Sequence, residues 1–130
     1  MIGARRLSTV TWDCIHFGSV DGVGTLHADE IGIAVRWLDG STIDSKDALL
    51  SQLASAFQFP SYFGHNWDAA EECLRDLGWL PANGYVLIIS AALGLWHSSP
   101  EATGTLIEVW LSAAAWWSEL NKPFHLVFSW

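Results

Sequence analysis

Two hydrophobic periods alternate along the chain, and they predict strands separated by helices. Short apolar runs rich in β-branched residues predict strands at Ile33–Leu38, Tyr85–Ser90 and Phe124–Trp130. The last two runs are apolar at nearly every position, which is typical of strands that are covered on both faces. The segments between the runs repeat apolar residues at i, i+3, i+4 and i+7, which predicts amphipathic helices.

Each predicted helix begins at a residue whose side chain can accept a hydrogen bond from a free first-turn amide: Asp44, Asn66 and Ser99. Each ends at or before a residue that a helix does not readily continue through: Pro60, Gly78 and Pro123. The segment Ala91–His97 is predicted as a loop or a short helical turn. The order β-α-loop-α-β-α-β indicates an α/β domain with a small parallel sheet of three strands and right-handed crossovers.

Residues 1–30 precede this pattern and are interpreted as an N-terminal extension of a domain spanning residues 31–130. The β-branched and aromatic run Thr9–Phe17 predicts a strand, and Gly24–Ala28 predicts a short second one. Three glycines between Gly18 and Gly24 predict a loop. We therefore expect an edge strand or hairpin added to the domain.

The helix after Asn66 has two unlike faces. Trp67, Ala70, Cys73, Leu74 and Leu77 follow the helical period and are predicted to be buried. The opposite face carries carboxylates at i, i+4 and i+8, namely Asp68, Glu72 and Asp76. Like charges at this spacing destabilise an isolated helix by roughly 0.2–0.5 kcal/mol per pair.

This carboxylate ridge has two interpretations. An expected pair between Glu71 and Arg75 relieves only part of the repulsion. The ridge is either a solvated helix face or a surface that binds a cation from outside. In the loop before the helix, Gly64 is expected to permit a turn that other residues resist.

The string FPSYFGHNWDAAEECL, residues 59–74, resembles the signature of the barstar family of intracellular inhibitors of a secreted ribonuclease. Its features are an aromatic loop, a glycine, Asn-x-Asp-Ala and an acidic helix. Arg36–Gly40 and Lys122–Val127 resemble the first and last strands of barstar-like domains. The resemblance covers about residues 31–130 and implies a barstar-like three-layer arrangement, in which helices flank a small three-stranded parallel sheet.

The resemblance also implies that the inhibitor contacts fall on Tyr62, Asp68 and Glu72. Glu72 stands where the family's type member has aspartate. Glu71 and Arg75 stand where it has tryptophan and threonine, so the identity of the inhibited ribonuclease stays open.

Composition narrows the functional class. A chain of 130 residues with 51% hydrophobic and 15% charged residues fits one globular domain. The net charge of −8 disfavours a nucleic-acid partner and favours a basic protein partner. No apolar run reaches the ~20 residues of a membrane span, and no apolar segment follows the basic start, so a cytoplasmic location is expected. Cys14 and Cys73 are expected to be buried free thiols.

Catalysis is the less favoured alternative. Asp68, Glu71 and Glu72 could form a carboxylate pair of the glycosidase type, but such a pair needs a cleft and one raised pKa. His65 could act as a base, although a partner contact suits an exposed loop histidine better. No spacing typical of metal ligands is present, so no metal is expected. No catalytic residue and no cofactor are expected either.

The predicted function is stoichiometric inhibition, of the immunity or antitoxin type, of a basic ribonuclease by a protein that is monomeric when free. The expected partner-binding residues belong to the aromatic loop and the acidic helix: Tyr62, His65, Asn66, Asp68, Glu71, Glu72, Arg75 and Asp76. The alternatives are an interaction or regulatory module for a non-nuclease basic partner and a small hydrolase that uses the helix carboxylates.

Overall fold

The computed structural model describes residues 2–23 and 31–130. Its strands are β1 (Ile2–Gly3), β2 (Ile15–Phe17), β3 (Val20–Asp21), β4 (Ile33–Asp39), β5 (Gly84–Ser90) and β6 (Phe124–Phe128). Its helices are α1 (Ala4–Leu7), the 3-10 turn η2 (Gly40–Thr42), α2 (Lys46–Ala56), α3 (Trp67–Asp76), α4 (Ala92–Ser98) and α5 (Pro100–Glu119).

The main sheet has four parallel strands in the order β2-β6-β5-β4. The three predicted strands form its contiguous part, with Val35 opposite Val86 and Leu87 opposite Leu126, so their parallel arrangement is confirmed. The sheet is nevertheless larger than the predicted three strands. β2 of the N-terminal segment pairs in parallel with β6, with His16 opposite Val127.

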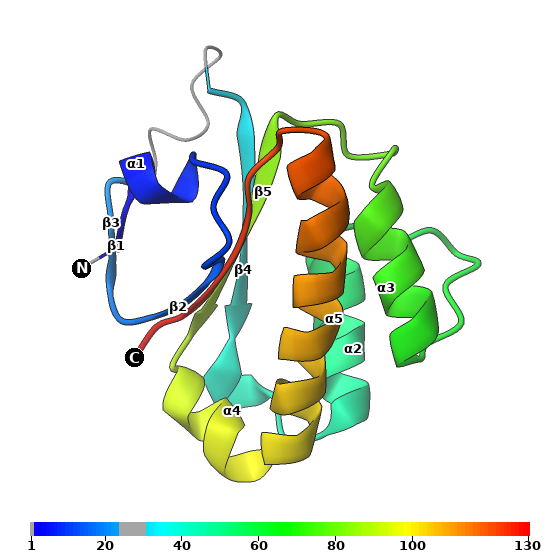
Figure 1. Cartoon of the computed structure of the whole chain (residues 1–130). Coiled ribbons are helices and arrows are strands. Elements are labelled where there is room, and N and C mark those ends of the chain that lie inside the picture. Colours follow the sequence, from blue (N-terminus) through cyan, green and yellow to red (C-terminus); the bar gives the residue numbers. More distant parts are fainter. Residues whose placement is uncertain (1, 24–30) are drawn as a thin grey trace.

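The three long helices α2, α3 and α5 cover one face of this sheet (Figure 1). The larger hydrophobic core lies between them, and its fully buried members include Leu53 of α2, Leu74 of α3, Trp110 of α5 and Leu87 of β5. Trp110 stacks on Phe124 with a distance of 4.1 Å between ring centroids. The predicted apolar stripes therefore face the sheet.

The N-terminal segment, in which no helix was predicted, covers the other face of the sheet. The apolar strands were expected to be shielded on this face. Leu7 of α1 packs there against Val35, Val86 and Val127 in a smaller second core. The predicted strand Thr9–Phe17 is wrong for its first six residues, since only Ile15–Phe17 runs along a partner strand.

The predicted loop Gly18–Gly24 contains β3, which pairs in parallel with β1. The two strands therefore form a small sheet of their own. The predicted strand Gly24–Ala28 lies outside the described residues. Figure 1 shows β1, α1 and β3 on the side of the sheet away from α3.

The starts of two helices differ from the prediction. The cap of α2 is shifted by one residue, and the predicted cap of α5 makes no side-chain cap bond. Ser45, and not Asp44, caps α2, because its hydroxyl accepts from the amide of Ala48 at 3.1 Å. Ser99 precedes Pro100 as predicted, but its side chain makes no cap bond, and its carbonyl accepts the Thr103 hydroxyl at 2.7 Å. The segment after β5 forms the short helix α4.

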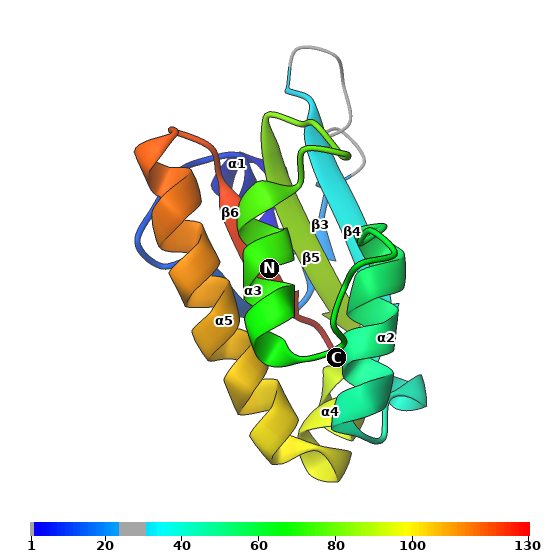
Figure 2. The same cartoon turned by 90° about the vertical axis from the view of Figure 1, so that its right-hand side faces the viewer.

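All four strands of the main sheet run in one direction, so α2, α3 and α5 begin at the same end of the molecule, beyond the carboxyl ends of the strands. Figure 2 shows α3 in front of the sheet, between α5 and α2. This places the outer face of α3 on the surface of the molecule. In the part of the chain that the structure describes, no helix has the length and apolar character needed to cross a membrane.

Candidate protein-binding surface

An aromatic cluster anchors the loop between α2 and α3. The rings of Phe59 and Phe63 meet edge to face at 5.0 Å, and Phe59 meets Trp79 at 6.4 Å. The indole N–H of Trp79 donates to the Phe57 carbonyl at 2.8 Å. With this much of the loop fixed, Tyr62 at its tip is 73% exposed and presents its ring to solvent.

The sharp bend before α3 is made by His65 and not, as expected, by Gly64. His65 has a φ of 54°, whereas Gly64 lies outside the left-handed region. A side chain on Gly64 would place its Cβ 3.1 Å from Nδ2 of Asn66, so close approach explains the glycine better than backbone freedom does. The ring of His65 lies 5.7 Å from that of Phe63 and is exposed.

Asn66 is the N-cap of α3, as predicted. Its Oδ1 accepts from the amide of Ala69 at 2.8 Å, and its Nδ2 donates to the Gly64 carbonyl at 3.1 Å. Both polar atoms of Asn66 are thus used within the chain. The residue fixes the angle between the loop and the helix, and this angle sets the position of Tyr62 relative to Asp68.

The inner face of α3 packs as predicted, with Ala70, Cys73 and Leu74 buried. Trp67 differs: it is only partly buried and lies at the mouth of a surface hollow. The indole N–H of Trp117 in α5 donates to the Leu74 carbonyl at 2.7 Å and holds the two helices together. Burial raises the pKa of the Cys73 thiol, and the charges of Asp76 and Glu72 raise it further.

The end of α3 also differs from prediction. Leu77, and not Gly78, takes the left-handed conformation, with a φ of 48°. Its side chain is buried, so the core contact outweighs the cost of a left-handed leucine. The amide of Gly78 donates to Oδ1 of Asp76 at 3.2 Å.

The outer face of α3 carries the predicted carboxylate ridge, and Asp68, Glu72 and Asp76 are all exposed. The expected pair is present, with Nη2 of Arg75 3.6 Å from Oε2 of Glu71. Within residues 2–23 and 31–130, the three ridge carboxylates have no ion-pair partner. With four carboxylates and one guanidinium, α3 carries a net charge of −3.

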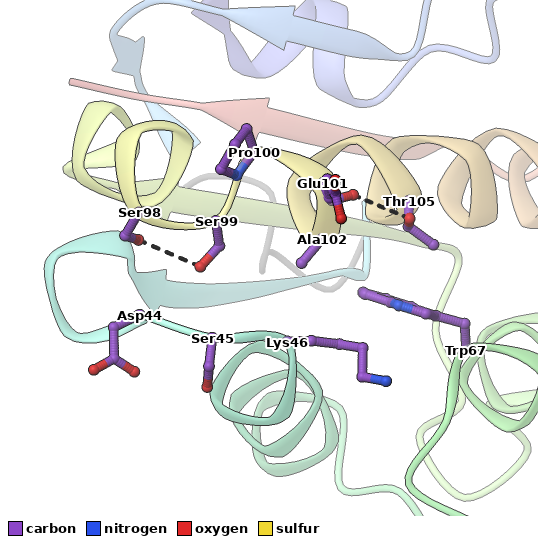
Figure 3. A pocket seen from close by; sticks show the side chains of 10 residues that line it. All are labelled: Asp44, Ser45, Lys46, Trp67, Ser98, Ser99, Pro100, Glu101, Ala102 and Thr105. Carbon is purple, nitrogen blue, oxygen red and sulfur yellow. Dashed lines mark hydrogen bonds between the residues drawn. The ribbon is translucent and has the colours of Figure 1, made fainter.

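A hollow of about 450 Å³ lies beside Trp67, between the first turns of α2 and α5 (Figure 3). Lys46 is the one cationic residue that lines this hollow, and Asp44 and Glu101 are the two acidic residues that line it. The Ser98 and Ser99 hydroxyls lie 3.4 Å apart, and Thr105 donates to the Glu101 carbonyl. These hydroxyls have no histidine or paired base among the lining residues, so the hollow shows no arrangement for nucleophilic catalysis.

The described residues also contain no group of three His, Cys, Asp or Glu side chains placed to hold a metal ion. Two histidines that the sequence interpretation left without a role, His16 and His125, form a buried pair under the N-terminal segment. Nε2 of His16 lies 2.8 Å from Nδ1 of His125. Neither lies on α3 or its loop.

The predicted partner-binding residues thus lie on the loop and on α3, and all of them are exposed except Glu71, which is partly exposed. What the sequence did not reveal is Trp116 of α5, which lines a hollow with Glu72, Arg75 and Asp76. Only the packing of α3 on α5 brings these residues together, although a second tryptophan beside the buried Trp117 was a visible signal.

Comparison with known proteins supports the resemblance. Residues 33–129 match the sequence profile of the family described as Barstar (barnase inhibitor). No curated protein matches the chain. The match begins and ends with the strands β4 and β6, and contains the loop and α3. Since it spans most of the 130 residues, the chain belongs to the barstar family.

Proposed function

We propose that the chain is a stoichiometric inhibitor of a basic ribonuclease, and that it blocks the active site with Tyr62 and the outer face of α3. The observation that carries this proposal is the ridge of Asp68, Glu72 and Asp76. These carboxylates are exposed and lack ion-pair partners in the described part of the chain, on a helix that a capped start and the Trp117 bond hold rigid. The family's description as a barnase inhibitor agrees with it.

The chemistry of a ribonuclease cleft explains why such a surface would inhibit. An enzyme that cleaves RNA must bind phosphates, and Lys, Arg and His side chains do so. Carboxylates one helical turn apart, about 5.4 Å, can each pair with a separate cation of that cleft. Tyr62 would add an aromatic anchor beside them.

The remaining residues of the surface would act in two ways. Asn66 orients the loop against the helix, since both of its polar atoms are already bonded within the chain. His65 would contact the partner beside Tyr62. The pair of Glu71 and Arg75 lies at the centre of the face, where a partner with a matching charge pair would be preferred.

In a cell this activity is that of an immunity protein or antitoxin, which acts in the cytoplasm and protects the cell that makes the ribonuclease. The net charge of −8 would draw a basic enzyme toward the chain before contact. The free chain would be a monomer, because the surface that binds the ribonuclease must stay open until the ribonuclease is bound.

The test starts with the immobilised chain and an extract of the strain that encodes it. We expect it to retain a basic protein with RNA-cleaving activity, and that activity to fall linearly to zero as one equivalent of chain is added. Barnase, named in the family's description, is the first purified enzyme to compare. Retained proteins without RNA-cleaving activity, or activity that persists in excess chain, would contradict the proposal.

A further inference from the structure

The N-terminal segment, residues 2–23, is attached to the sheet through a small buried area. Its buried side chains are Leu7, Cys14 and His16, and its other described side chains are partly or fully exposed. Its own elements are the single-turn helix α1 and three strands of two or three residues, which are too short to be stable alone. The family match begins only at residue 33. The segment is therefore an addition to the family's domain, and its attachment depends on these few buried side chains.

Two histidine rings form the polar part of this attachment. Nε2 of His16 in β2 lies 2.8 Å from Nδ1 of His125 in β6. Nε2 of His125 lies 2.7 Å from the carbonyl oxygen of Thr9. Both rings are buried, and both contacts run from the segment to β6. A change in the protonation of these rings would therefore act directly on the attachment of the segment.

The surroundings of the two rings favour their neutral forms. The charged side chains that act on them are Arg6 of α1 and Asp13, which form an ion pair with each other. On β5, the residue opposite His125 is the apolar Val86. One added proton can be shared between the rings, but it leaves a positive charge in a buried site beside Arg6. A second proton would set two N–H groups against each other, so protonation favours separation of the rings.

We propose that residues 2–23 are an acid-released cover of the sheet: protonation of His16 and His125 detaches the segment as one unit while the domain of residues 33–129 stays folded. The larger core, between the sheet and the helices α2, α3 and α5, can hold that domain together. Release would uncover the apolar second face of the sheet, which includes Val35, Val86 and Val127. The outer face of α3 lies on the opposite side of the sheet (Figure 1), so this inference does not rest on the proposed inhibitor function.

The two buried free thiols can report the opening of two different parts of the chain. Cys14 lies in the segment and Cys73 in α3, and each is 4% exposed. The full chain is reacted with dithiodipyridine at pH 7, 6 and 5, and the reaction at each cysteine is followed by peptide mass. Each rate is divided by the rate of the same cysteine in the urea-unfolded chain at the same pH. This normalised rate is free of the effect of pH on the thiol itself.

We expect the normalised rate of Cys14 to exceed that of Cys73 at each pH. Between pH 7 and pH 5 it should rise about twentyfold, because the pKa of His16 is about 4 in the attached segment and 6.5 in a solvated one. Equal normalised rates for the two cysteines would show that only the whole chain opens. A Cys14 rate that does not change with pH would show that the reagent enters through the hollow that Cys14 lines. Either result would overturn the proposal.

A pair of variants tests the role of the histidines. His16→Gln can still donate to Nδ1 of His125 but cannot take up a proton, so the rise at Cys14 should be about twentyfold smaller than in the wild type. The matched control is His97→Gln, which removes an exposed histidine of α4 and should keep the full rise. Equal rises in the two variants would overturn the role of the pair. The comparison of Cys14 with Cys73 in the wild type tests the release without any substitution.

Discussion

The buried pair of His16 and His125 makes the stability of the chain sensitive to mild acid. Nε2 of His125 lies 2.7 Å from the Thr9 carbonyl, which can only accept, so His125 donates there. Its Nδ1 is then free to accept from Nε2 of His16. This arrangement gives both ring nitrogens of His125 a partner, gives Nε2 of His16 an acceptor, and ties the N-terminal segment to β6.

Burial, together with the nearby His125 and Arg6, lowers the pKa of His16 from 6.5 to about 4, against the opposing charge of Asp13. Burial also lowers the pKa of His125. The unfolded chain therefore binds more protons than the folded chain below pH 6.5. The contribution of the neutral histidine pair to stability is fully present above pH 7 and is lost as the pH falls from 6.5 toward 4.

The magnitude follows from the proton balance. Between pH 7 and pH 5, His16 alone should lower the free energy of unfolding by about 2 kcal/mol, since a full proton difference is worth about 1.4 kcal/mol per pH unit. The assay is urea unfolding at pH 7, 6 and 5 for the wild type and for His16→Gln, whose amide can still donate to His125. Equal losses in both proteins over this range would refute the neutral pair.

Three further predictions concern the binding surface. Trp117→Phe keeps an aromatic ring but removes the five-membered ring whose N–H donates to the Leu74 carbonyl, so urea unfolding should show a loss of about 1–3 kcal/mol, and an unchanged midpoint would show that the bond does not hold α3 to α5. Asn66→Ala should cost about 1 kcal/mol of stability by removing the helix cap, and a melting temperature equal to that of the wild type would contradict that role. The association rate with the inhibited ribonuclease should fall steeply as salt rises, because opposite net charges steer the encounter, and a salt-independent rate would place the interface elsewhere.

Local signals in the sequence predicted α3 well. The cap of Asn66, the buried face around Leu74 and the outward carboxylates all follow from spacing within a few residues. The errors of one position have local causes too. Asp44 and Ser45 are both good caps, and burial of Leu77 decided the helix end against Gly78.

The missing parts depend on contacts between distant segments. The pairing of β2 with β6 joins residues more than 100 positions apart, and the short run Ile15–Phe17 gave no sign of its partner. The coverage of the second sheet face by Leu7 and the buried histidine pair follow from that pairing. The place of Trp116 beside Glu72 likewise depends on the packing of two helices.

The most direct test of the claim that the outer face of α3 is the inhibitory surface is the Kd of the complex with the ribonuclease. It should be measured for the wild type, for Glu72→Gln and for Asp21→Asn, which removes an exposed carboxylate on the side of the sheet away from α3. The two variants lose the same charge. Glu72→Gln should raise the Kd at least about tenfold through a lost charged hydrogen bond, and Asp21→Asn should bind as the wild type does. Equal Kd values for the two variants would contradict the account.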